Sequence, residues 1–117
     1  MCIRDRLQTV AFFHFNVDGD MVATIQAYEE ILQRWPDDVA ALNNLAISYN
    51  EKRRYADAER VVRRGIEVAP QTGVLWFNLM DALGRQGRFA AADSAFRRWS
   101  EVAPQAQNRF QVRYRIA

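Results

Sequence analysis

Few residues of this chain have the types and spacing that chemistry requires. Asn16, Asp18 and Asp20 have the one-three-five spacing of a calcium-binding loop. Such a loop also needs a glycine at its sixth residue and a glutamate at its twelfth, where this sequence has Met21 and Ala27. These polar residues therefore predict a turn before a helix, with Asp20 as the residue that caps the helix.

A single histidine and a single cysteine are the other candidates for catalysis or metal binding. His14 has no pattern of carboxylates or cysteines around it, and a general base needs a placed partner. Cys2, alone and without a histidine nearby, supports neither a disulfide nor a metal site. The sequence has no glycine-rich phosphate loop and no nucleophile elbow. We therefore predict no catalytic residue, no metal and no cofactor.

The elements that carry these residues follow from three prolines, Pro36, Pro70 and Pro104, which stand 34 residues apart and are the only prolines in the chain. Each ends a segment with two stretches in which apolar residues recur every three or four positions, as in helices with one buried face. Short polar or glycine-bearing breaks separate the stretches. The sequence thus predicts an all-α solenoid of three antiparallel helix pairs, each packed on the next.

This spacing resembles the tetratricopeptide repeat, which has large, Leu, small and Tyr positions on its first helix and Ala, aromatic, small and Pro positions on its second. The middle segment fills nearly every position, with Leu42, Leu45, Ala46, Tyr49, Ala58, Val62, Gly65 and Pro70. The third segment fits well, and the first fits in its second half. The resemblance implies a right-handed superhelix of helical hairpins that binds other proteins.

Four positions depart from the family pattern, because they hold a large side chain where a small one is usual. They are Phe12, Ile31, Met80 and Trp99. Overpacking of this kind costs about 1–3 kcal/mol unless the neighbouring helix moves. We therefore expect the outer helix pairs to splay, or to pack against something outside this chain.

The repeats divide residues 7–104 into units of about 7–38, 39–72 and 73–106, followed by a truncated fourth repeat or tail at 107–117. Apolar residues in this tail suit either a helix or a strand. Residues 1–6 resemble a translated sequencing adaptor, as in a bacterial environmental read, and we set them aside as a non-native leader. The true N-terminus is then expected to be missing, and the chain to be a fragment of a longer protein.

The net charge is only +2, but the charges are unevenly distributed. Residues 1–38 carry 3 basic and 7 acidic side chains, residues 39–72 carry 6 and 4, and residues 73–117 carry 7 and 3. We interpret these charges as solvated helix faces with no further role. The alternative is that the gradient supports head-to-tail self-association through uncapped ends. No apolar stretch is long enough to span a membrane. The compartment is not defined by the sequence, although a cytoplasmic one is favoured.

Side chains of the first helix in each unit that do not pack within the array should line its concave face. We predict that this groove binds a peptide or helix of a partner protein through Phe13, Asn43, Asn44, Ile47, Phe77, Asn78 and Asp81. An asparagine side chain both donates and accepts hydrogen bonds, so it can pair with the backbone of a peptide. The alternative is that these asparagines bond to one another within the array.

Some relatives in this family hold the C-terminal carboxylate of a chaperone with basic side chains in the groove. Asn44 matches one asparagine of that clamp, but Thr9, Val74 and Asn78 stand where the basic residues would be. The resemblance therefore does not extend to a carboxylate clamp.

Arginine pairs at 63–64 and 97–98 form two rungs of a ladder on the convex side. Such a ladder could hold phosphates or an acidic partner. The first unit breaks it with two glutamates at 29–30, and no aromatic residues alternate with the arginines as in single-strand binders. We predict a solvated surface and no nucleic-acid partner.

The leading hypothesis is therefore a protein-interaction module with no catalysis of its own. One alternative is an ancillary region of a larger bacterial enzyme, such as a signalling protein kinase. The other is a structural spacer or self-assembly element.

Overall fold

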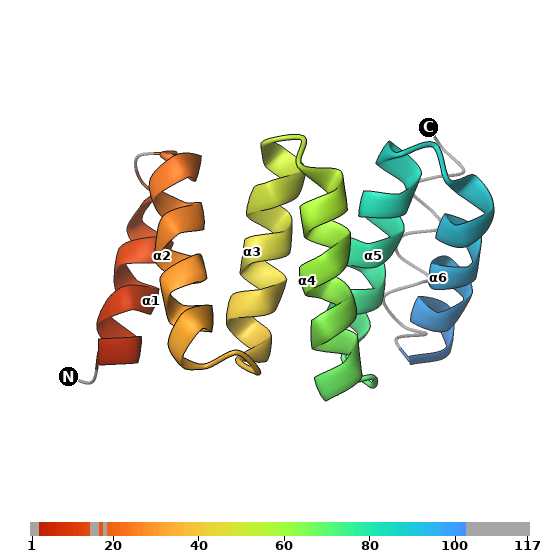
Figure 1. Cartoon of the computed structure of the whole chain (residues 1–117). Coiled ribbons are helices and arrows are strands. Elements are labelled where there is room, and N and C mark those ends of the chain that lie inside the picture. The colour runs from red at the N-terminus through yellow and green to blue at the C-terminus, as the bar shows by residue number, and fades with distance from the viewer. Residues whose placement is uncertain (1–2, 15–16, 18, 103–117) are drawn as a thin grey trace.

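The structure, a computed structural model, describes residues 3–14, 17 and 19–102. Within these residues the chain forms helices that alternate in direction and lie side by side along one axis (Figure 1). The helices are α1 (Ile3–Phe13), α2 (Met21–Arg34), α3 (Val39–Glu51), α4 (Tyr55–Val68), α5 (Gly73–Arg85) and α6 (Phe89–Val102). The predicted all-α array of antiparallel helix pairs is confirmed, and the predicted start of a fourth unit lies outside the described residues.

Aspartates begin two of the helices. The Asp20 carboxylate accepts a hydrogen bond from the Ala23 amide at 3.0 Å, so its predicted role as the cap of α2 is confirmed. The Asp38 carboxylate accepts one from the Ala41 amide at 3.1 Å and caps α3 in the same way. Each cap satisfies one of the amide groups that have no partner inside the first turn of a helix. Asn16 and Asp18 lie outside the described residues.

The first helix begins at Ile3, within the segment that resembles a translated adaptor. Its Arg4 guanidinium lies 5.5 Å from the centre of the Trp35 ring and 3.8 Å from the Asp38 carboxylate. Residues 3–6 therefore form the first turn of α1, and Arg4 contacts the segment that connects α2 to α3.

The turn inside each hairpin uses one residue with a left-handed backbone. These residues are Gly19, Arg53 and Gly87, with φ of 68°, 61° and 78°, again 34 positions apart. In the second turn the Arg54 amide donates to the Tyr49 carbonyl at 2.8 Å, which closes the end of α3. Glycine adopts this conformation at no steric cost, whereas a residue with a Cβ is strained by it.

Replacing Arg53 by glycine should therefore raise the free energy of unfolding by about 1 kcal/mol, because the strain of the left-handed backbone is removed. Its neighbour Lys52, with φ of −89°, is the matched control. Lys52→Gly should destabilise the protein, since glycine there only adds freedom to the unfolded chain. Urea unfolding of both variants measures the two effects, and changes of the same sign would contradict this account.

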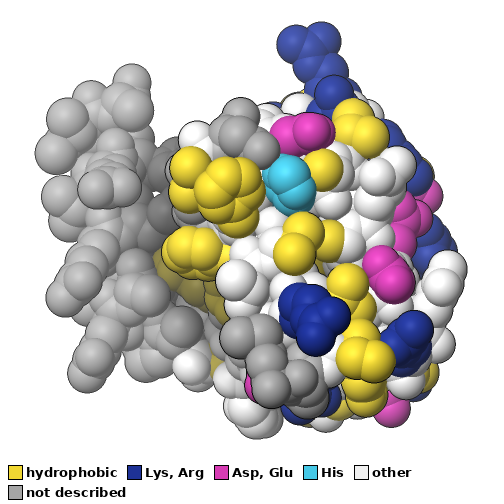
Figure 2. All heavy atoms as spheres, turned by 90° about the vertical axis from the view of Figure 1, so that its left-hand side faces the viewer, with side chains coloured by type: hydrophobic (Ala, Val, Ile, Leu, Met, Phe, Trp, Pro, Cys, Tyr) yellow, Lys and Arg dark blue, Asp and Glu magenta, His cyan; other side chains and the backbone are white. Residues whose placement is uncertain are grey.

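The core runs along the seams between neighbouring helices. Helix α3 lies between the first and third hairpins and buries seven of its residues, including Leu42, Leu45, Ala46 and Tyr49. In α1, by contrast, Ala11 alone is buried among the described residues. The end face formed by the first hairpin accordingly exposes hydrophobic side chains (Figure 2). A solenoid buries each unit only against its neighbours, so its end faces stay open.

The second and third units pack closely against each other at Gly65 of α4. A Cβ placed there would lie 3.0 Å from Cδ2 of Leu75 in α5. One repeat earlier the equivalent positions hold Ile31 and Ala41, both fully buried. The larger side chain of the pair is therefore on α2 at the first seam, and on α5 at the second seam.

The remaining large residues at small positions behave differently from one another. Trp99 is buried like Ile31, whereas Phe12 is exposed and Met80 is only partly buried.

Candidate functional site

The residues predicted to line the groove come from the first helix of each hairpin. Phe13 lies at the end of α1 and is exposed. Asn43, Asn44 and Ile47 lie on α3 and are half-buried. On α5, Phe77 and Asp81 are half-buried, whereas Asn78 is only 6% exposed.

The three asparagines form a chain of hydrogen bonds across the array. The Asn78 amide donates to the Asn43 carbonyl oxygen, and the Asn43 amide lies 3.5 Å from the Asn44 carbonyl oxygen. Burial raises the pKa of Tyr28 on α2, and the neighbouring Asn44 side chain offsets part of that rise. The amides therefore bond within the array, which was the alternative left open by the sequence.

A second polar group lies further along the same helices. Asp81 accepts hydrogen bonds from the Asn50 amide at 3.4 Å and from the Arg85 guanidinium at 2.9 Å. Arg85 also lies 5.9 Å from the centre of the Tyr55 ring. Asp81 thus joins α3 to α5 and holds Arg85 in place.

The apolar members of the predicted groove are partly covered by their neighbours. The Phe77 and Trp99 rings are 5.8 Å apart, and Trp99 also contacts Phe96 at 5.7 Å. The edge of the Phe13 ring packs against His14 at 5.6 Å. Phe13 and Phe77 each keep part of their surface exposed, so a partner could bury them further.

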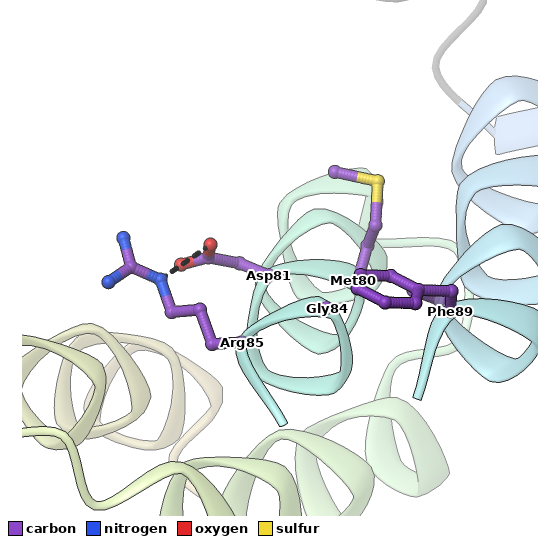
Figure 3. Close-up of a pocket in the computed structure, with 6 residues that line it drawn as sticks. Met80, Asp81, Gly84, Arg85 and Phe89 are labelled. Atoms are coloured by element: carbon purple, nitrogen blue, oxygen red, sulfur yellow. Dashed lines mark hydrogen bonds and ion pairs between the residues drawn. The ribbon is translucent and has the colours of Figure 1, made fainter. Parts of the chain in front are cut away.

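Sequence reasoning missed a pocket of about 440 Å³ between α5 and α6. Figure 3 shows Met80 and Phe89 on one side of it, with the ion pair of Asp81 and Arg85 on the other. Gly84 and Ala92 complete the lining. The signal in the sequence was Phe89, a large apolar residue directly after the turn, where the second unit has Tyr55.

The arginines of the convex ladder are paired with acidic residues. Arg63 bonds to Glu59 at 2.9 Å, and Arg64 bonds to Asp37 and Glu67. In the third unit, the Arg97–Asp93 and Arg98–Glu101 pairs are 3.0 Å and 2.7 Å long. Because these cations already have carboxylate partners, a phosphate would have to displace them.

Glu59 is the most connected of these acids. Burial raises its pKa, but hydrogen bonds from Arg63 and Gln86 outweigh burial and hold the pKa below its usual value. Arg88 adds an ion pair at 2.7 Å. Since Gln86 and Arg88 belong to the third unit, Glu59 joins the two hairpins on the convex side.

Within the described residues, no group of histidine, cysteine and acidic side chains could hold a metal ion. None of the described helices is long and apolar enough to cross a membrane.

Helical hairpins that stack at a constant interval define a solenoid protein. A profile of the tetratricopeptide repeat matches residues 18–83. The chain belongs to the tetratricopeptide repeat family, as the sequence predicted.

Known proteins resemble the chain in sequence and in structure. It is 35% identical over 57 residues to ypp1 of Schizosaccharomyces pombe, a protein named for cargo transport; the match covers 49% of this chain and 7% of ypp1. The TPR2B domain of yeast Sti1, solved in a complex with pHsp70, superimposes with a TM-score of 0.83 and 17% identity, over 95% of this chain and 88% of that one. An O-GlcNAc transferase of Thermobaculum terrenum matches with a TM-score of 0.79 and 24% identity, over 87% of this chain and 19% of the transferase.

Proposed function

We propose that the groove formed by α1, α3 and α5 binds a peptide or a helix from a partner protein, and that this chain performs no catalysis of its own. The observation that carries the proposal is the row of partly exposed apolar side chains, Phe13, Ile47 and Phe77, beside half-buried amides. Apolar anchors next to groups that bond to a backbone are the usual means of holding a peptide.

In this proposal, two of the asparagines contact the ligand and the third positions them. An asparagine side chain has two donor hydrogens and an oxygen with two lone pairs, so Asn43 and Asn44 retain bonding capacity beyond their bonds to each other and to Asn78. Asn78 is buried and acts as a positioning residue, because it holds Asn43 rather than contacting the ligand.

The groove favours an internal segment with apolar side chains over a free C-terminal carboxylate. Thr9, Val74 and Asn78, at the positions that would hold a carboxylate, are uncharged. The likeness to the Sti1 domain, solved with a bound partner, supports the use of the groove for binding. The partner of Sti1 is not thereby the partner of this chain.

A random-peptide display library selected on the immobilised protein would provide the probe. Fluorescence anisotropy would then give the affinity of a selected peptide for the wild type, for Ile47→Ala/Asn44→Ala in the groove and for Arg63→Ala/Arg97→Ala on the convex side. We expect the groove variant to bind on the order of tenfold more weakly, because an anchor and a bonding group are lost. The convex variant should bind like the wild type. Equal affinities, or selection of no peptide at all, would refute the proposal.

A second proposal concerns the protein in which the groove works. The chain spans 19% of the transferase and 7% of ypp1, so arrays like this one occur as parts of much longer chains. We propose as the alternative that it is the partner-binding region of a larger enzyme. The complete reading frame tests this directly, because a catalytic domain beside the repeats would support it and a frame with repeats alone would exclude it.

A further inference from the structure

The seam between the second and third units shows which positions join neighbouring hairpins. Three of the contacts that cross from α5 to the second hairpin involve polar side chains of α5. Asn78 bonds to Asn43, Asp81 bonds to Asn50, and Arg85 stacks on Tyr55. All three are polar.

The first hairpin has apolar side chains at the three positions that correspond to those of the third hairpin in these contacts. Counted back by two repeats of 34, Asn78, Asp81 and Arg85 correspond to Val10, Phe13 and Val17. These side chains are 41%, 49% and 67% exposed. They lie on the first hairpin, whose end face gathers hydrophobic side chains in Figure 2.

At the opposite end of the array, the positions equivalent to the polar receiving residues also hold apolar residues. Counted forward by 34, the receiving residues Asn43, Asn50 and Tyr55 correspond to Phe77, Gly84 and Phe89. Gly84 and Phe89 line the pocket of about 440 Å³ (Figure 3), and Phe89 is 73% exposed. The polar pairs of the internal seam are thus replaced by apolar groups on both ends.

We propose that the protein assembles head to tail, with the α1 face of one copy docked on the α5–α6 end of a second copy. The contact repeats the seam between hairpins, with Phe13 and Val17 directed to the pocket at Gly84 and Phe89. Charge favours this pairing, because the described residues between 3 and 38 carry 3 basic and 6 acidic side chains, whereas residues 73–102 carry 4 and 3. Trp99 stands in the place of Gly65, so the docked helix sits further from α6 than α5 does from α4.

A contact between two different faces leaves one of each exposed in every pair, so assembly continues beyond the dimer unless the rotation closes a ring. Light scattering under reducing conditions should show a mass that rises above 13.6 kDa with concentration. Added salt should reduce the rise, because it screens the charges of the two ends.

Two variants remove one face each. Val10→Glu and Phe89→Glu place a charge in an exposed position, outside the seven residues of the peptide groove, and each should weaken association at least about tenfold. An equimolar mixture of the two should form a species of twice 13.6 kDa and grow no further, since one intact face remains on each partner. Val68→Glu, at an exposed position of α4, should associate like the wild type.

A mass of 13.6 kDa at every concentration would overturn the proposal, and would leave the end faces to residues 103–117 or to another protein. Failure of the mixture to pair would also overturn it, because a contact between identical faces cannot be restored by mixing. Equal disruption by Val68→Glu would show that added charge, and not the loss of a face, prevents association. These outcomes are measured without peptide, because Phe13 belongs both to this face and to the proposed groove.

Discussion

Gly65→Ile should lower the free energy of unfolding by about 1–3 kcal/mol and Leu75→Ala by about 2–5 kcal/mol, yet the double variant should lose less than the sum. The two side chains share one space, since a Cβ at residue 65 would lie 3.0 Å from Cδ2 of Leu75. Shortening Leu75 therefore makes room for the isoleucine, and the isoleucine fills part of the cavity that alanine leaves.

The seam between the first and second units already contains this exchanged arrangement. Ile31 and Ala41 hold the equivalent positions and are fully buried. Urea unfolding of the wild type, the two single variants and the double variant forms a double-mutant cycle. We expect a favourable coupling of about 1 kcal/mol or more; agreement with simple addition to within about 0.5 kcal/mol would contradict the proposed exchange of bulk.

Leu45→Ala should be among the most damaging single substitutions, with an expected loss of about 2–5 kcal/mol. Leu45 is among the largest fully buried side chains and lies in the middle of α3, which contacts the hairpins on both sides. The alanine would leave a cavity that rigid helices on two sides cannot close.

Val74→Ala is the matched control for Leu45→Ala, because Val74 is exposed at the start of α5. It should change the free energy of unfolding by less than about 0.5 kcal/mol. Thermal and urea unfolding measure both variants. A loss below about 1 kcal/mol for Leu45→Ala would show that the central helix adapts to the missing side chain.

Most of the architecture could be predicted from the sequence because it rests on repeated, local signals. The prolines at 34-residue intervals, the apolar periodicity and the polar breaks indicate six helices and the turns between them. The cap at Asp20 follows from its residue type and its place before an apolar stretch. Such signals do not depend on how distant side chains meet.

The details that depend on pairs of residues were beyond the sequence. Comparison with the family pattern indicated that Ile31 is large for its position. It did not indicate that Ala41, which packs opposite Ile31, is correspondingly small. The groove asparagines were equally consistent with a ligand contact and with bonds inside the array, because both uses suit an amide. The pocket beside Phe89 depends on the gap between two helices, which no local pattern reports.

The hydrogen bonds that run from Asn44 through Asn43 to Asn78 join α3 of the second hairpin to α5 of the third. A ligand that binds Asn44 must compete with these hydrogen bonds. Its binding would therefore change the contact between the second and third hairpins. By thermodynamic reciprocity, whatever tightens the stacking of the hairpins would then also change the affinity for the ligand.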